Sequence, residues 1–148
     1  MIPEQTRVPP ACRADFVHWS TVATRWHDND VYGHVNNVVY YSYFDTVVNA
    51  YAVSRGGLDI HAGGTIGIVV ESGCRYHAAL AFPEIIDAGL RVDRIGHSSV
   101  RYSLGLFAAG GEIAAADGHF VHVMVDRKTR RPVAIPAGLR QSLLDIAT

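Results

Sequence analysis

The chain of 148 residues is 49% hydrophobic and 18% charged, a composition typical of one globular domain and not of a disordered chain. Its formal net charge of −1 argues against a nucleic-acid partner and against a basic membrane-binding face. The two cysteines, Cys12 and Cys74, are too few for a disulfide framework, and no apolar run approaches the roughly 20 residues that span a bilayer. We therefore expect a cytoplasmic protein that contacts neither nucleic acid nor membrane.

Residues 1–14 are expected to form a flexible leader in front of a single domain at residues 15–148. The leader contains three prolines and no apolar run of signal-peptide length. Residues 16–25 follow, rich in valine, threonine and aromatic side chains and free of glycine and proline. This composition predicts the first strand.

The next segment, residues 25–37, concentrates polar and ionisable side chains. It reads Arg-Trp-His-Asp-Asn-Asp-Val-Tyr-Gly-His-Val-Asn-Asn and directly precedes a predicted helix. Its carboxylates and histidines would therefore lie beside free backbone N–H groups at the positive end of a helix dipole. Such a setting suits a reaction in which an oxygen atom gains negative charge.

A long helix is predicted at residues 38–55. Large apolar side chains recur there at spacings of four, three and four, namely Tyr40, Phe44, Val47 and Tyr51. Polar residues occupy only a narrow stripe, so the rest of the protein should wrap around this helix. We expect Asn36 or Asn37 to cap its start and Gly56–Gly57 to end it.

From Thr65 onward the hydrophobic period changes to 2, which predicts a series of strands. They cover residues 66–77, 86–93, 100–106 and 113–126, with a glycine pair at 110–111 as a hairpin signal and a short helix at 139–146 after them. A long apolar helix followed by consecutive strands predicts an α+β fold, with an antiparallel sheet wrapped around the helix. The open edges of such a sheet predict self-association.

The segment Arg25-x-x-Asp28-x-Asp30-x-x-Gly33-His34-Val35-Asn36-Asn37-x-x-Tyr40, followed by a buried helix and a strand meander, resembles the hotdog-fold acyl-CoA thioesterases of the 4-hydroxybenzoyl-CoA thioesterase-like family. The resemblance extends over roughly residues 16–144. It implies a curved antiparallel sheet around one long central helix, and active sites at an interface between two subunits. We therefore expect a homodimer or a homotetramer, and a small-molecule acyl-CoA as the substrate.

The resemblance also assigns roles to the loop residues. The catalytic carboxylate of the family corresponds to Asp30, acting as general base or nucleophile, and the backbone N–H that polarises the thioester carbonyl corresponds to the helix start at Asn37. The loop is similar as well to that of plant acyl-carrier-protein thioesterases, where an Asp and a His act in the chemistry. Asp30 and His34 match these two residues. The plant enzymes have an Asn between them, whereas this chain has Tyr32 there.

Further residues are candidates for holding the substrate. The Asn36 side chain could position the thioester, and Tyr32 could line an acyl pocket or belong to the core. Ser98 and Ser99 could bind the pantetheine arm or simply begin a strand. Arg130 and Arg131 suit the phosphates of coenzyme A, although such a basic turn is equally typical of a solvated surface. Glu71 and His77 are candidates for a second carboxylate and a polar wall, with packing or solvent exposure as the alternative.

The leading hypothesis is an acyl-CoA thioesterase that needs no cofactor, since coenzyme A is part of its substrate. An acyl-carrier-protein thioesterase and a non-catalytic acyl-thioester-binding protein are the alternatives. The loop spacing fits no metal motif, and the chain lacks the Gly-x-Ser-x-Gly elbow of serine hydrolases. The His-Phe-Pro type signature of hotdog dehydratases is also missing.

Overall fold

The computed structural model describes residues 8–148. Five strands and two α-helices follow one another, with short 3₁₀ turns at Arg13–Asp15 and Trp26–Asp28. In chain order the elements are β1 (His18–Ala23), α1 (Val39–Ser54), β2 (Thr65–Tyr76), β3 (Ile85–Ile95), β4 (Ser99–Ala108), β5 (Ala116–Asp126) and α2 (Ala137–Asp145). The predicted elements are all present, and their ends differ from the predictions by a few residues.

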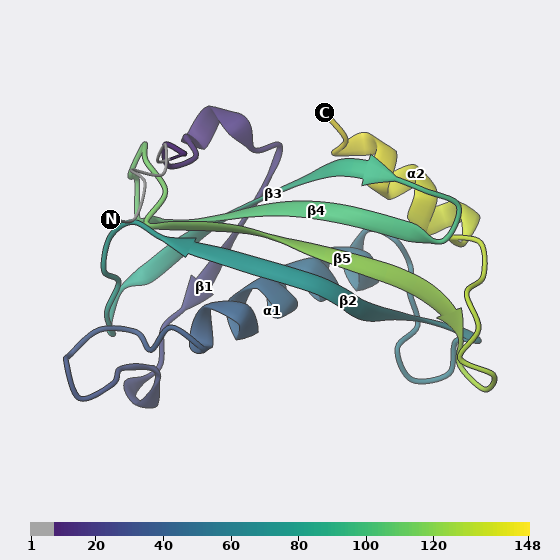
Figure 1. Ribbon diagram of the computed structural model, residues 1–148, viewed down its shortest axis with the longest axis horizontal. Helices are drawn as coiled ribbons and strands as arrows, with labels where there is room; N and C mark the ends of the chain where they lie inside the picture. Colours follow the sequence, from purple (N-terminus) through teal and green to yellow (C-terminus); the bar gives the residue numbers. More distant parts are fainter. Residues whose placement is uncertain (1–7) are drawn as a thin grey trace, which may run out of the picture.

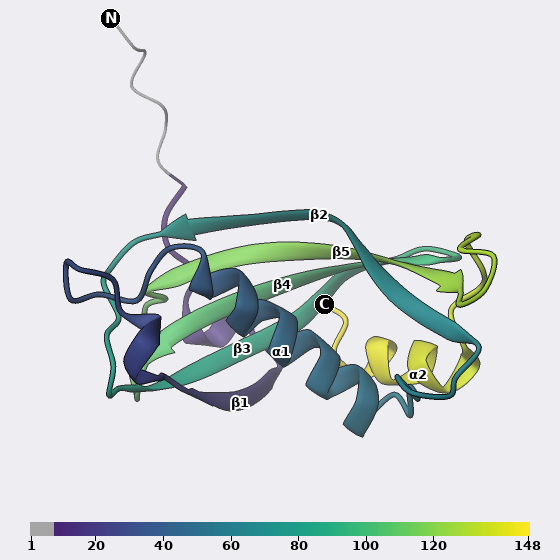
Figure 2. The same cartoon turned by 90° about the horizontal axis from the view of Figure 1, so that it is seen from below.

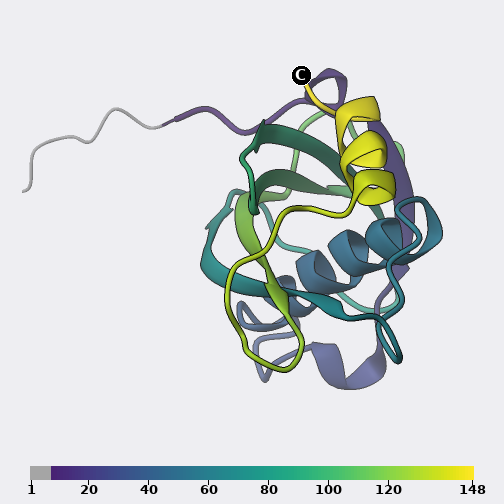
Figure 3. The same cartoon turned by 90° about the vertical axis from the view of Figure 1, so that its right-hand side faces the viewer.

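The strands form one antiparallel sheet in the order β1-β3-β4-β5-β2. The predicted hairpin is confirmed, because β4 and β5 are antiparallel neighbours and Gly110 adopts a φ of +72° in the turn between them. β1 and β2 lie at opposite edges of the sheet (Figure 2). The sheet curves around α1, as the view along the molecule shows (Figure 3), so the expected α+β hotdog arrangement is confirmed.

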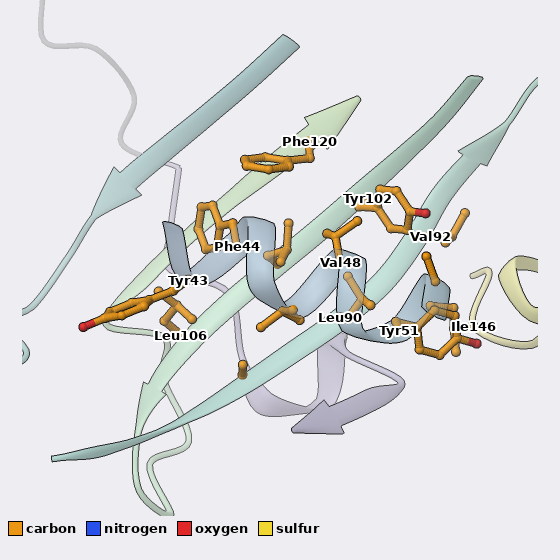
Figure 4. Packing of buried hydrophobic residues seen from close by; sticks show 14 of the residues in the cluster. Tyr43, Phe44, Val48, Tyr51, Leu90, Val92, Tyr102, Leu106, Phe120 and Ile146 are labelled. Carbon is orange, nitrogen blue, oxygen red and sulfur yellow. The ribbon is translucent and has the colours of Figure 1, made fainter. Parts of the chain in front are cut away.

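The core lies between α1 and the concave face of the sheet. Alternate residues of β3 and β4, such as Leu90 and Tyr102, point toward Phe44 and Val48 of the helix (Figure 4). Seven side chains of α1 are buried, and the polar stripe that contains Ser42 and Asp45 is exposed. The helix is therefore covered on its sheet-facing side, and its other side remains open in this single chain.

The opposite face of the sheet has a smaller apolar cluster in which Phe16 packs against Phe107. The chain segment before β1 reaches this face, since Ala11 accepts a hydrogen bond from the Ala114 N–H and Arg13 forms an ion pair with Asp87. Residues 1–7 of the expected leader lie outside the described residues, and the packed domain includes residues 11–14. Within residues 8–148, no helix has the length and apolar character needed to cross a membrane.

The loop before α1 and the turn after β5 lie at opposite ends of the molecule (Figure 1). The carboxyl end of β2 is at the same end as that loop, because the Tyr76 hydroxyl donates a hydrogen bond to the Asn37 carbonyl oxygen, 3.0 Å away. This arrangement decides which of the polar residues can act together.

Candidate active site

Asp28 anchors the loop that precedes α1. Its carboxylate is fully buried and accepts hydrogen bonds from the Arg25 backbone N–H (2.9 Å) and the Tyr43 hydroxyl (2.7 Å), and it pairs with the Arg25 guanidinium at 2.9 Å. Burial by itself would raise the pKa of Asp28, but the hydrogen bonds from Tyr43 and Arg25 outweigh burial and lower it below its ordinary value. Asp28 therefore holds the loop in place.

Asp30 lies in a tight turn that the loop forms upon itself. Its backbone N–H donates to the His34 carbonyl oxygen (2.8 Å), and its carbonyl oxygen accepts from the Gly33 N–H (3.1 Å). Gly33 has a φ of +83°, a conformation that side-chain-bearing residues rarely adopt. One carboxylate oxygen of Asp30 accepts the Tyr32 N–H (2.8 Å), and the side chain stays half-exposed. The turn thus holds a carboxylate at the surface with one oxygen uncommitted.

The helix begins differently from the prediction. Val38 is the N-cap residue and no side chain caps the helix, so the expected cap by Asn36 or Asn37 is wrong. The Asn36 side-chain oxygen instead accepts the Val38 N–H (3.1 Å), and its backbone carbonyl accepts the Val39 N–H (2.9 Å), which makes a turn ahead of the helix. At the other end, Gly57 has the expected positive φ of +67°.

This turn leaves the Asn37 backbone N–H available. Among the hydrogen bonds formed by residues 8–148, none uses this N–H, while the neighbouring N–H groups of Asn36, Val38 and Val39 are all bonded. Asn37 is an exposed residue. A free amide directly ahead of a helix lies at the positive end of the helix dipole and is a ready donor for an oxygen that carries negative charge.

Asp30 and Asn37 line one open groove of about 490 Å³. Its other lining residues come from the same loop, from α1, from the end of β2 and from the chain after it, namely Tyr32, His34, Val35, Tyr40, Tyr76, His77, Ala78 and Ala79. The Tyr40 and Tyr76 rings pack edge to face at 5.0 Å, and burial raises the pKa of both hydroxyls. The groove therefore combines a carboxylate, imidazoles and a free amide with an aromatic wall.

The structure brings together only part of the predicted site. Tyr32, His34 and Asn37 lie in the groove with Asp30, and Asn36 lies just behind it in the turn before α1. Ser99 opens β4 opposite Val123, and Arg130 and Arg131 follow the end of β5. Since β5 begins beside Tyr76 and extends over 11 residues, these side chains and Ser98 are on the order of 30 Å from the groove within one protomer.

Glu71 also lies away from the groove. It pairs with Arg101 and His119 at 3.3 Å, on the face of the sheet that is turned away from α1. Tyr76, in contrast, lines the groove and was not among the predicted residues, although its position at the end of an alternating strand was visible in the sequence. Within residues 8–148, no group of three histidine, cysteine, aspartate or glutamate side chains is placed to hold a metal ion.

Comparison with known proteins adds independent information. The sequence profile of the thioesterase-like superfamily matches residues 24–143, which includes the loop, α1 and all of the strands after them. None of the curated proteins matches this chain. The match covers most of the chain and contains the residues that form the groove.

Solved structures agree with this assignment. The PA5185 protein of Pseudomonas aeruginosa strain PAO1 is 54% identical over 95% of this chain and 98% of its own, with a TM-score of 0.93. The PA2801 protein of the same species, described as a candidate thioesterase, is 26% identical over 86% of this chain and 98% of its own, with a TM-score of 0.78. The DHNA-CoA thioesterase of Staphylococcus aureus shares the fold at 18% identity, 86% and 89% coverage and a TM-score of 0.76. The chain belongs to the thioesterase-like superfamily and has the hotdog fold of its thioester hydrolases.

Proposed function

We propose that this protein is an acyl-CoA thioesterase in which Asp30 and the Asn37 N–H act on the same thioester. The observation that carries the proposal is the free Asn37 N–H directly ahead of α1, in one groove with the half-exposed Asp30 carboxylate. Superfamily membership supports thioester hydrolysis as the reaction class. The groove supplies the two groups that this reaction needs.

The chemistry follows from these two groups. Attack on a thioester carbonyl places negative charge on its oxygen, and a preorganised amide donor stabilises that charge without reorganising in the transition state. Asp30 either removes a proton from the attacking water or attacks the carbonyl carbon itself. His34 and Tyr32 line the same groove, where they can contact the acyl group or the thiol arm.

A dimer would bring the basic turn to this groove. β2 is an edge strand, and Val69 and Val70 on it are 45% and 57% exposed. If two copies pair their β2 strands antiparallel about a two-fold axis, the Tyr76 end of one strand lies beside the Thr65 end of the other. The Arg127 N–H bonds to the Gly64 carbonyl oxygen (2.8 Å) at that Thr65 end. Arg130 and Arg131 of one subunit would then reach the phosphates of a coenzyme A held in the groove of its partner.

The same turn supports a second candidate substrate. Lys128, Arg130 and Arg131 are exposed, and an acyl carrier protein with an acidic surface would be attracted to them as well. The acyl-carrier-protein thioesterase therefore remains the alternative to the acyl-CoA thioesterase. The two differ in whether free acyl-CoA is turned over.

Thiol release tests the proposal and the role of Asp30 together. The parent protein, Asp30→Asn and Asp59→Asn are assayed with short, medium, long-chain and aromatic acyl-CoAs, and with acyl carrier protein loaded with the same acyl groups. Asp59 is the matched control, since its carboxylate also accepts loop N–H groups, those of His61 and Ala62 at 3.0 Å, and it does not line the groove. We expect Asp30→Asn to lower kcat/KM by about 100-fold or more and Asp59→Asn to leave it unchanged.

The possible outcomes separate the proposals. Turnover of acyl-CoA that Asp30→Asn abolishes supports the acyl-CoA thioesterase, and the preferred chain identifies the substrate class. Turnover only of the loaded carrier protein would replace it by the alternative. Stoichiometric ligand binding without thiol release from any substrate would instead identify a non-catalytic binding protein, and full activity of Asp30→Asn would assign the chemistry to another residue.

A further inference from the structure

Asp117 on β5 is a buried carboxylate that contacts His77. It is only 3% exposed, and its Oδ1 accepts Nε and Nη2 of Arg75 at 2.9 and 2.7 Å. Its Oδ2 accepts the Ala11 N–H at 2.9 Å and lies 2.9 Å from Nε2 of His77. Every contact of this carboxylate is therefore with a donor, and the Arg75 guanidinium balances its charge.

These contacts determine which nitrogen of the neutral His77 ring carries the hydrogen. Because Asp117 accepts hydrogen bonds from Arg75 and Ala11, it is a carboxylate, and Nε2 of His77 must be the donor toward it. In a neutral imidazole the other nitrogen, Nδ1, then holds the lone pair and acts as acceptor or base. Among residues 8–148, no group forms a hydrogen bond with this Nδ1.

In the chain, His77 lies between two residues that form hydrogen bonds with the loop and with the segment before α1. On one side of it in the chain, Tyr76 donates its hydroxyl hydrogen to the Asn37 carbonyl oxygen (3.0 Å). On the other side, the Leu80 carbonyl oxygen accepts the Val35 N–H (2.8 Å). The His77 backbone is also held in place, since its backbone N–H donates to the Ala115 carbonyl oxygen at 2.8 Å. His77 thus lines the same groove as Asp30, with its ring 18% exposed.

We propose that His77, oriented by Asp117, is the general base that activates water in this groove. An imidazole with one nitrogen held by a carboxylate and the other free is the arrangement by which proteins make a histidine a base. The inference rests on the proposed thioester hydrolysis, and it assigns to Asp30 the role of nucleophile, because His77 takes the role of base.

The proposed steps balance as follows. The Asp30 carboxylate attacks the thioester carbon, the C–S bond breaks, and a thiolate and an acyl-aspartyl anhydride form. Nδ1 of His77 then takes a proton from water as the water oxygen attacks the acyl carbon of the anhydride, and the Asp30 carboxylate leaves. The imidazolium gives that proton to the thiolate, so that one thioester and one water yield one acid and one thiol.

The test compares His77→Gln with His97→Gln in steady-state thiol release from pH 5 to 9. His97 is an exposed histidine in the β3–β4 turn, at the end of the sheet away from the groove. We expect His77→Gln to lower kcat by about 100-fold with little change in KM, and to abolish the fall in kcat on the acid side of the profile. His97→Gln should keep both the rate and the profile of the parent.

A second measurement does not depend on how the variant folds. In ¹⁵N-labelled parent protein at a pH where imidazole is neutral, the His77 ring should carry its hydrogen on Nε2, and a hydrogen on Nδ1 would overturn the proposal. If Asp30→Asn abolishes activity and His77→Gln retains it, His77 is not part of the mechanism, and the proposed thioesterase function still holds. A parent that cleaves no thioester would remove the proposed function and this inference together.

Discussion

Two aspartates that are two positions apart in one loop have opposite surroundings. Asp28 is fully buried and uses its oxygens to hold Arg25 and Tyr43, whereas Asp30 is half-exposed and accepts one backbone N–H. A carboxylate whose lone pairs are all engaged cannot attack or remove a proton, so Asp28 serves to hold the loop. This difference is what makes Asp30 the reactive candidate.

The Tyr43 hydroxyl should contribute measurably to stability through Asp28. In Tyr43→Phe the buried carboxylate loses a donor at 2.7 Å, which should lower the free energy of unfolding by about 1–3 kcal/mol in urea titrations. Tyr41→Phe is the matched control, because the half-buried Tyr41 is on the same helix and its hydroxyl forms no hydrogen bond among residues 8–148. Equal stability of the two variants would contradict this account of the loop anchor.

At the scale of secondary-structure elements, β2 is the least protected strand. It pairs only with β5, its register shifts between Val69 and Glu71, and apolar side chains on it are exposed. A strand edge with exposed apolar side chains favours pairing with another strand. Figure 2 shows β2 at the edge of the sheet with no strand beyond it.

A charge on this edge should therefore prevent dimer formation. In Val70→Lys, two ammonium groups would face each other across the two-fold axis, and like charges opposite each other destabilise paired strands. Light scattering after size exclusion should give the mass of a dimer, or of a tetramer built from dimers, for the parent and the mass of a monomer for the variant. Ile85→Lys, at a similarly exposed apolar residue of β3, should keep the parent mass. A monomeric parent, or a Val70→Lys protein that keeps the parent mass, would exclude pairing through β2.

At the scale of the whole molecule, the core contains a buried histidine, which should make the free energy of unfolding depend on pH. His122 on β5 is 5% exposed, packs against the rings of Tyr102 and Phe120 at centroid distances of 5.5 and 6.0 Å, and has no partner for Nε2 among residues 8–148. Burial lowers the pKa of His122, and the negative charge of Asp45 on α1 offsets this only in part. The neutral ring is therefore the form that the folded protein accommodates.

This burial predicts a loss of stability in mild acid. The unfolded chain takes up a proton on this histidine near its ordinary pKa of about 6.5, while the folded chain does so only at lower pH, so stability falls as pH drops through that interval. We expect the free energy of unfolding to fall from pH 7 to pH 5 in the parent and to fall less in His122→Phe. His18, whose pKa is also lowered by burial, and then by the charge of Arg55, should account for part of the remaining dependence.

His61→Gln provides the comparison for this experiment, since His61 is exposed in the loop after α1. It should show the same loss of stability between pH 7 and pH 5 as the parent. If His122→Phe loses as much stability as the parent over this interval, the acid sensitivity originates elsewhere in the fold.

Local patterns in the sequence were sufficient for the elements and for the loop that carries Asp30. The helical period and the alternation of the strands are properties of neighbouring residues, so α1, β2, β3, β4 and β5 could be predicted without a structure. The helix start was predicted wrongly, because the backbone turn at Asn36 competes locally with capping and both use the same short side chain. Asp30, His34 and Asn37 lie within eight residues of one another, and such closeness in the chain keeps them in one groove.

Only the tertiary structure decided which distant residues can work with that loop. The length of the sheet separates the groove from four of the predicted residues, namely Ser98, Ser99, Arg130 and Arg131. The strand order sets this distance. His77 and Asp117 are 40 residues apart in the chain, and their contact exists because β2 and β5 pair in one particular register. The sequence by itself determined the elements and the reactive loop, since both depend on short-range periodicity and turn chemistry. The register and order of the strands determined the partners of that loop, since long-range contacts are specified by the packing of the whole chain.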